Sequence, residues 1–280
     1  RSVAPHRWTD IAMVFQGAMN AFNPVKSVGW QIAEAMEIHG TARGRTGLQR
    51  VRELLELVGI DPDQASRYPH QFSGGMRQRA IIAMALACNP KVLLADEPTT
   101  ALDVVVQDQV LRLLVDLSNK FDLGVILVTH DLGVVAESCG RAAVMLKGEL
   151  VEQGPVTDLY HRPQHPYTKR LFSSTPSITT QKAQPDASGR KPESLLDVKD
   201  LEVAYAARRT PKDIILRRSP SPKMAVNGIS LSVGRGELVA LVGQSGCGKT
   251  STLQAVLRML PASSGRLELA GRDITHLHGR

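Results

Sequence analysis

Gly243-Gln244-Ser245-Gly246-Cys247-Gly248-Lys249-Thr250 matches the pattern GxxxxGK[ST] and decides the fold class. The apolar run Glu237–Val242 precedes it, and Ser251–Arg258 follows it with a helical pattern, so the predicted order is strand, loop and helix. The glycines let successive backbone N–H groups converge on phosphate oxygens, and the start of a helix favours an anion. We therefore expect a nucleotide site on an α/β core with a parallel sheet.

The residues of this loop have distinct expected roles. Lys249 would reach the β- and γ-phosphates, and the Thr250 hydroxyl would coordinate Mg²⁺. The rest of the loop and the residue after it would surround the phosphates, which adds Gly243, Gln244, Ser245, Gly246, Cys247, Gly248 and Ser251 to the predicted nucleotide-binding set. Cys247 lies at a helix start, where the helix dipole should favour its thiolate form.

A second group of polar residues follows the short apolar run Lys91–Ala95, which is typical of a buried strand. Asp96 and Glu97 end this run, at the edge where parallel strands place their chemistry. Asp96 would hold Mg²⁺ through water, and Glu97 would accept a proton from the water that attacks the γ-phosphate. The alternative is that the carboxylates merely end a strand in solvent.

A third group is Phe72–Arg79, in which Ser73 is placed to cap the apolar helix that follows. This block closely resembles the signature sequence of ATP-binding cassette (ABC) proteins. Other segments of that family's pattern recur around it, namely Phe15-Gln16, Ala101-Leu102-Asp103 and Val128-Thr129-His130-Asp131. The resemblance implies a P-loop NTPase core, a helical signature subdomain and a small antiparallel β subdomain.

The resemblance also implies roles for single residues near the γ-phosphate. Gln16 would sense Mg²⁺ and the attacking water, and the segment after it would face the membrane partner. His130 would hold the γ-phosphate and orient Glu97. Tyr205 resembles the aromatic residue that stacks on adenine, although it is equally a strand residue that packs inward.

Four further residues would act between two cassettes. Ser73, Gly74 and Gly75 would contact the γ-phosphate of a nucleotide held by an opposing cassette, and Asp103 would lie in the loop that couples the two sites.

The segment Tyr160–Leu171 contains His165-Pro166-Tyr167 and resembles the segment that closes cassettes of peptide and nickel importers. Ala18–Val25 resembles the same group. The first segment is also readable as a proline-rich turn ahead of a short helix, so it indicates a subfamily and not a catalytic group.

The motif order is unusual, because the lysine loop at 249 follows the histidine at 130. One interpretation is a section of a tandem protein, with part of a first cassette at 1–178, a linker at 179–194 and the opening of a second cassette at 195–280. The alternative is that both portions pair as one permuted cassette, since each family motif occurs once. Circular permutation is tolerated when termini lie at the surface.

Composition limits the partners. The net charge of +7 is largely local, because residues 206–223 hold six basic residues against Asp213, and 4% aromatic content offers little for base stacking. We expect no nucleic acid partner.

The three cysteines, Cys88, Cys139 and Cys247, lack metal-ligand spacing and are expected to be free thiols. With no long apolar run, we expect a peripheral protein that attaches to the membrane through partners.

The leading hypothesis is therefore an ATPase, using ATP and Mg²⁺, that drives import of peptides or a related small solute. Its implied partners are transmembrane permease subunits, an extracytoplasmic solute-binding protein and a second cassette, at the cytoplasmic face of the membrane. The alternatives are a soluble ABC ATPase acting on nucleic acid or ribosomes, and a remnant that binds nucleotide without turnover.

Apolar patterns also predict individual elements. Parallel strands are expected at Val92–Ala95 and Val125–Thr129, with a helix at Val104–Lys120 and a helical insert before the signature. Alternating patterns predict that Leu195–Tyr205, Ile229–Val233 and Arg266–Leu269 form the antiparallel sheet.

Overall fold

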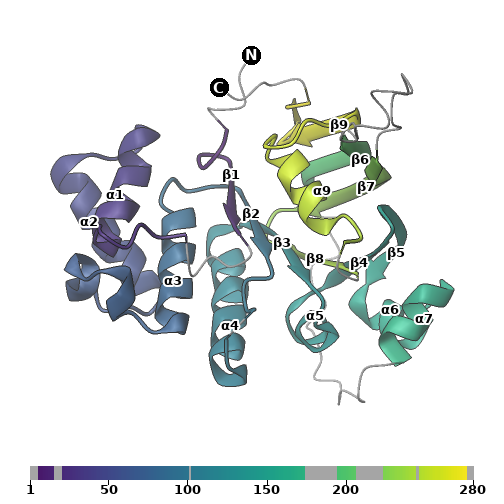
Figure 1. Cartoon of the computed structure of the whole chain (residues 1–280), viewed down its shortest axis with the longest axis horizontal. Coiled ribbons are helices and arrows are strands. Elements are labelled where there is room, and N and C mark those ends of the chain that lie inside the picture. The colour runs from purple at the N-terminus through teal and green to yellow at the C-terminus, as the bar shows by residue number, and fades with distance from the viewer. Residues whose placement is uncertain are drawn as a thin grey trace, which may run out of the picture.

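The structure is a computed structural model that describes residues 6–15, 21–100, 102–173, 194–205, 223–243 and 246–275 (Figure 1). Within these residues, the larger sheet has six strands in the order β1-β2-β3-β8-β4-β5. The first five in that order run parallel, and β5 pairs antiparallel with β4 at one edge. The bounds are β1 Ile11–Val14, β2 Val92–Asp96, β3 Gly124–Thr129, β8 Leu238–Val242, β4 Arg141–Leu146 and β5 Glu149–Pro155.

Strand β8 comes from the second portion of the chain but lies between β3 and β4 of the first portion. Its Ala240 is paired with Leu127 on one side and with Ala142 on the other. All five residues of β8 are buried. Glu237, just before it, accepts from Arg141 at 2.8 Å. The two portions therefore share one sheet, which is the arrangement that the permuted alternative requires.

The smaller sheet has the order β10-β9-β6-β7 and is antiparallel. Its strands are β6 Ser194–Tyr205, β7 Lys223–Gly234, β9 Ser264–Leu269 and β10 Arg272–Asp273. All three predicted strands of this sheet are confirmed, although β7 extends well before Ile229.

Both faces of the large sheet are covered, as parallel strands require. In β2, Val92 and Leu94 face one apolar cluster together with the smaller sheet and helix α9 (Lys249–Val256). Leu93 and Ala95 face the other cluster, which contains the remaining helices. This alternation buries β2 on both of its faces, between the two clusters.

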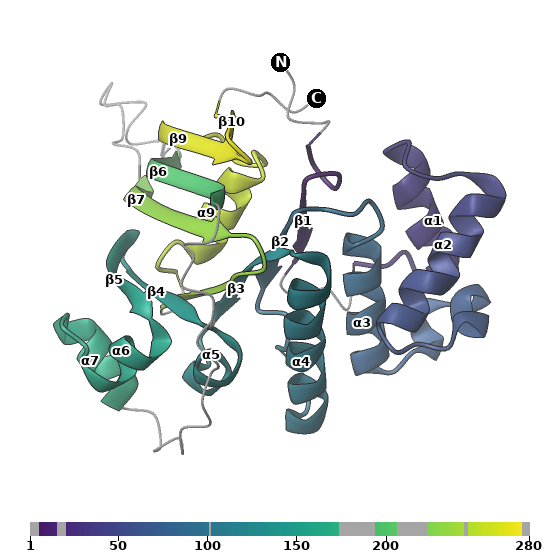
Figure 2. The same cartoon turned by 180° about the vertical axis from the view of Figure 1, so that it is seen from behind.

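The helices confirm the predicted layout (Figure 2). Helix α4 (Val104–Phe121) matches its predicted range, and a helical insert precedes the signature helix α3 (Gly74–Ala85). The insert lies beyond α3 from the sheet and contains α1 Val28–Ile38, α2 Gly44–Leu57 and the 3₁₀ turns η2 Pro62–Ser66 and η3 Pro69–Gln71. The remaining helices are α5 Leu132–Ser138, α6 Val156–His161 and α7 Pro166–Ser173.

Several sequence predictions fall wholly or largely outside the described residues. They include Gln16, the linker at 179–194 apart from Ser194, which begins β6, and the basic segment 206–223 apart from Lys223, which begins β7. Among the helices that the structure describes, none combines the length and apolar character needed to cross a membrane.

Candidate functional site

The phosphate loop joins β8 to α9, as predicted. Gly243 follows β8, and Lys249 begins α9, two residues earlier than the helix expected from Ser251. Gly248, the cap of α9, has φ of 108°, and a Cβ there would lie 2.3 Å from the Ala225 carbonyl oxygen. Glycine is therefore required at this position for two reasons: its φ is positive, and there is no room for a Cβ atom. Gln244 and Ser245 lie outside the described residues.

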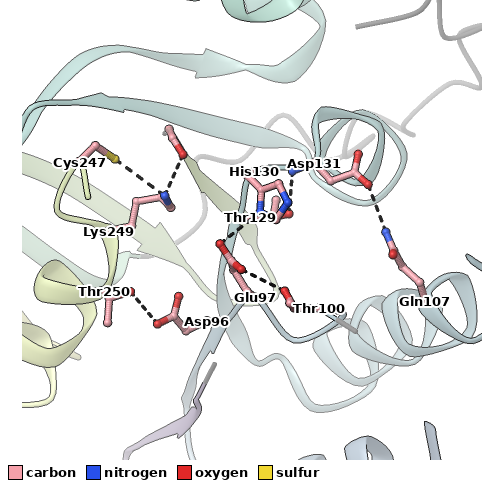
Figure 3. Close-up of polar contacts among 11 residues, drawn as sticks. Asp96, Glu97, Thr100, Gln107, Thr129, His130, Asp131, Cys247, Lys249 and Thr250 are labelled. Carbon is pink, nitrogen blue, oxygen red and sulfur yellow. Dashed lines mark hydrogen bonds and ion pairs between the residues drawn. The ribbon is translucent and has the colours of Figure 1, made fainter. Parts of the chain in front are cut away.

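Lys249 and Cys247 are packed into the loop itself. The Lys249 side chain donates from Nζ to the Gly243 carbonyl oxygen at 2.8 Å, and Nζ lies 3.9 Å from Cys247 Sγ (Figure 3). Burial raises the pKa of the Cys247 thiol, outweighing the opposing effect of the Lys249 cation. The expected thiolate form of Cys247 is therefore wrong, because the side chain is only 5% exposed and burial outweighs the effect of the helix start.

The two portions of the chain meet at Thr250 and Asp96. Thr250 Oγ1 donates to Asp96 Oδ2 at 2.9 Å, and burial raises the pKa of the Asp96 carboxyl group. A hydroxyl and a carboxylate are the oxygen ligands that Mg²⁺ takes in phosphate sites, where phosphates and water complete its shell. This pair fits that ion, although the part of the chain described here holds no cluster of three or more His, Cys, Asp or Glu residues suited to a metal.

Glu97 lies beside this pair in a constrained backbone conformation, with φ of 46°. Its Oε1 is 3.2 Å from His130 Nδ1, and its Oε2 accepts from Thr100 Oγ1 at 3.0 Å (Figure 3). The side chain of Glu97 is 15% exposed, and Asp96 is buried. The interpretation of these carboxylates as a solvated strand end is therefore wrong.

Glu97, Lys249 and Thr250 line one pocket of about 510 Å³. Its lining residues are Glu97, Lys147, Tyr205, Met224, Ala225, Gly246, Gly248, Lys249, Thr250 and Ser251. Tyr205 ends β6, is 41% exposed, and its hydroxyl lies 3.0 Å from Ser251 Oγ. It does not pack inward, so that alternative is wrong.

Sequence reasoning missed four residues of the site. Thr100 follows Glu97 by three residues, and a turn between them brings the Thr100 hydroxyl to the Glu97 carboxylate. A predicted turn after the strand would have identified it. Lys147, Met224 and Ala225 belong to no motif, and they line the pocket only because the β4–β5 turn and the start of β7 approach the phosphate loop.

The signature residues lie away from this pocket. Ser73 caps α3 by accepting from the Met76 N–H at 3.3 Å, which confirms the predicted cap. A Cβ at Gly75 would lie 2.4 Å from Val106 Cγ1, so Gly75 lets α3 approach α4 closely. In Figure 1, α3 stands on the opposite side of α4 from α9.

Asp103 caps α4, accepting from the Val106 N–H at 3.0 Å. Neither Asp103 nor Ser73, Gly74 and Gly75 lines the pocket that holds Lys249.

The His-Pro-Tyr segment forms the start of α7. The Glu152 carboxylate accepts from the N–H groups of Gln164 and His165 at 2.8 and 3.0 Å, and His165 Nδ1 accepts from the Tyr167 N–H at 3.2 Å. Tyr167 is buried. The prediction of a turn ahead of a short helix is confirmed.

Family comparisons match three parts of the chain. The model described as ABC transporter matches residues 3–100 and 226–280, which together exceed half of the chain. The model described as oligopeptide/dipeptide transporter, C-terminal region, matches residues 151–212, between those two parts.

Among curated proteins, the chain is similar to glutathione import ATP-binding protein GsiA from several bacteria. It is 41% identical to the Escherichia coli (strain K12) protein over 295 residues, which cover 97% of this chain and 46% of that protein. It is 40% identical to the Shigella dysenteriae protein, with the same coverage. The chain thus spans about half the length of the curated relatives it matches.

Among solved structures, a dimeric ATP-binding cassette in a post-hydrolysis state with ADP and phosphate is 30% identical. That match covers 53% of this chain and 64% of the other, with a TM-score of 0.47. On the family match, the chain belongs to the ABC transporter family and carries the C-terminal region of its oligopeptide/dipeptide transporters.

Proposed function

We propose that this chain binds ATP with Mg²⁺, and that ATP hydrolysis by the protein to which it belongs drives import of peptides or a related small solute. One observation carries the proposal. Thr250, which is bonded to Asp96, and Glu97, which is bonded to His130, come from the two portions of the chain and line one pocket beside the phosphate loop. The import class is supported by the oligopeptide/dipeptide match and by the glutathione import relatives.

Each side chain has one task in this proposal. Backbone N–H groups around Gly246 and Gly248 hold phosphate oxygens, Lys249 reaches the β- and γ-phosphates, and Tyr205 stacks on the adenine. Thr250 and Asp96 would hold Mg²⁺, whose positive charge would offset the charge of the phosphates.

A second pair of residues, Glu97 and His130, acts on the attacking water. Glu97 accepts its proton, and His130, 3.2 Å away, orients the Glu97 carboxylate. Thr100 fixes the other oxygen of the same carboxylate. By the family resemblance, Gln16 would contact this water and the metal.

We also propose that the chain is the central section of a two-cassette protein, with the divisions 1–178, 179–194 and 195–280. The relatives align along 97% of this chain and 46% of their own length, and the C-terminal region of one cassette lies between the two cassette matches. In such a protein the grouping of these residues would change: Lys249 and Thr250 would share one nucleotide with Ser73, Gly74 and Gly75, and Asp103 would couple the two sites. Gln16, Glu97 and His130 would then belong to the other nucleotide site, whereas in this chain alone Glu97 and Thr250 line one pocket. Permease subunits, a solute-binding protein and the second cassette would be partners at the cytoplasmic face of the membrane.

Glu97→Gln tests the assigned chemistry. The change keeps the size of the side chain and its hydrogen bond from Thr100, but removes the basic carboxylate. We expect Mg-ATP affinity within about twofold of the wild type and turnover slowed by roughly 10²-fold or more, because general-base help is lost. Isothermal titration gives the affinity, and phosphate release gives the rate.

Glu56→Gln, on the exposed face of α2, is the matched control and should leave both values unchanged. Undiminished turnover in Glu97→Gln would contradict the role of Glu97. A wild-type chain that binds ATP without turning it over would contradict the hydrolysis half of the proposal.

A further inference from the structure

The turn between β4 and β5 has an unusual residue at its tip. Lys147 and Gly148 form this two-residue turn, with φ of 50° and 89°. Turns with two positive φ values favour Asn-Gly or Asp-Gly, because most side chains are strained in the left-handed region. The backbone of the turn therefore does not favour lysine at position 147, and a role for its side chain in the pocket would explain the residue.

The backbone of this turn is fixed against the phosphate loop. Gly148 N–H donates to the Cys247 carbonyl oxygen at 2.8 Å, and Asn227 N–H donates to the Gly148 carbonyl oxygen at 2.7 Å. The Asn227 side chain also donates to Glu149 at 2.8 Å. A Cβ at Gly148 would lie 2.7 Å from the Ala225 carbonyl oxygen, so the turn is also in close contact with β7. These contacts hold Lys147 in place relative to the loop.

Lys147 lines the same pocket as Tyr205 and Lys249. The charged lining residues are two lysines and one carboxylate, Glu97, so the pocket favours an anion. Lys249 is buried and bonded within the loop, whereas Lys147 is exposed and has no side-chain hydrogen bond or ion pair with any residue that the structure describes. Its flexible four-carbon stem allows the ammonium group to follow a ligand.

We propose that Lys147 is a second cationic contact for the phosphate chain of the nucleotide, outside the phosphate-loop motif. This inference rests on the proposed function. The turn abuts Cys247, so Lys147 meets the phosphates from the side of the loop, while Lys249 meets them from the start of α9. The contact is electrostatic, which makes it selective for nucleoside di- and triphosphates over the nucleoside and sensitive to ionic strength.

Lys147→Asn tests this contact without weakening the fold, because asparagine suits the left-handed turn position better than lysine. The measurements are the Kd values for Mg-ATP, Mg-ADP and adenosine by isothermal titration, at about 0.05 M and about 0.5 M salt. We expect the Kd for Mg-ATP to rise about threefold to tenfold at the lower salt, and less at the higher. Adenosine affinity should not change, and thermal unfolding should show no loss of Tm.

Two matched variants isolate the charge. Lys147→Arg should bind Mg-ATP within about twofold of the wild type, because the cation is retained. Lys169→Asn makes the same charge change at an exposed site on α7 outside the pocket, and should have no effect.

Equal Mg-ATP affinity in wild type and Lys147→Asn at both salt concentrations would overturn the inference while leaving the proposed function intact. An equal loss of adenosine affinity would also overturn it, since the contact would then be to the base or ribose. A wild-type chain that fails to bind Mg-ATP would overturn the proposed function, and the inference with it.

Discussion

At the scale of single residues, burial controls the chemistry of Cys247. Its thiol lies inside the phosphate loop, where the start of α9 and Lys249 both favour the thiolate, yet burial raises its pKa. The thiol is therefore protonated at neutral pH. Because the thiolate is the nucleophile, Cys247 should react slowly despite its position.

We expect iodoacetamide to modify Cys247 more slowly than it modifies the urea-unfolded chain at pH 7.5, with a rate that rises with pH toward the raised pKa. Mg-ATP should slow the reaction further by covering the loop. Peptide mass spectrometry follows the modified fraction with time. Cys139, which is fully buried elsewhere, is the internal control and should not respond to Mg-ATP. Equal modification of Cys247 with and without Mg-ATP would contradict a nucleotide at this loop.

The residues of the site differ in how far sequence reveals them. Lys249, Thr250, Asp96 and Glu97 were predictable because each lies in a local pattern that places it at a strand end or helix start. Lys147 was not, because its position depends on contacts between segments about 80 to 100 residues apart, such as Asn227 N–H to Gly148 and Gly148 N–H to Cys247.

At the scale of elements, α7 depends on a cap from another strand. Glu152 of β5 accepts from two N–H groups ahead of α7. Partial burial would raise the pKa of Glu152, but the hydrogen bonds that the carboxylate accepts hold it below the usual value. A lowered carboxyl pKa means that the cap contributes stability at neutral pH, and that this contribution is lost as pH falls through the lowered value.

Glu152→Gln should therefore lower the free energy of unfolding by about 0.5–2 kcal/mol at pH 7, the usual range for a lost helix cap. The difference from the wild type should shrink as the pH falls through the lowered pKa of Glu152, where the wild-type carboxylate also takes up a proton. Urea unfolding followed by circular dichroism at several pH values measures this. Glu56→Gln makes the same charge change at an exposed site on α2 and serves as the control, and an equal pH profile for both variants would contradict the cap.

Element boundaries show where local patterns fail. The sequence predicted a strand at Ile229–Val233, but β7 begins at Lys223. Asn227-Gly228 is a typical turn signal, and Gly228 indeed has φ of 63°, yet the chain continues as a strand. Irregular pairing with β6 accommodates the glycine, because the register shifts between Leu201 and Val203. Only the neighbouring strand decides between a turn and a bulge.

At the scale of the whole molecule, the position of β8 assembles the site. The apolar run that forms β8 predicted a buried strand, and the motifs predicted its parallel sheet. The strands beside β8 were not predictable, because a short apolar strand can pair at any position of a parallel sheet that is buried on both faces. Sequence therefore left open whether the two portions pair. In the structure, β8 lies between β3 and β4 and brings Thr250 to Asp96.

The most direct test of this shared site is a double-mutant cycle on Mg-ATP affinity with Asp96→Ala, Thr250→Ala and both together. Each single change should weaken Mg-ATP binding by roughly tenfold or more, and removal of Mg²⁺ with a chelator should erase most of the difference. Because the two side chains touch, the account predicts a coupling free energy of about 0.5–3 kcal/mol, so that the double variant is less impaired than the single losses combined. Strictly additive losses, or an Asp96→Ala chain that binds Mg-ATP as well as the wild type, would contradict a single nucleotide site built from both portions.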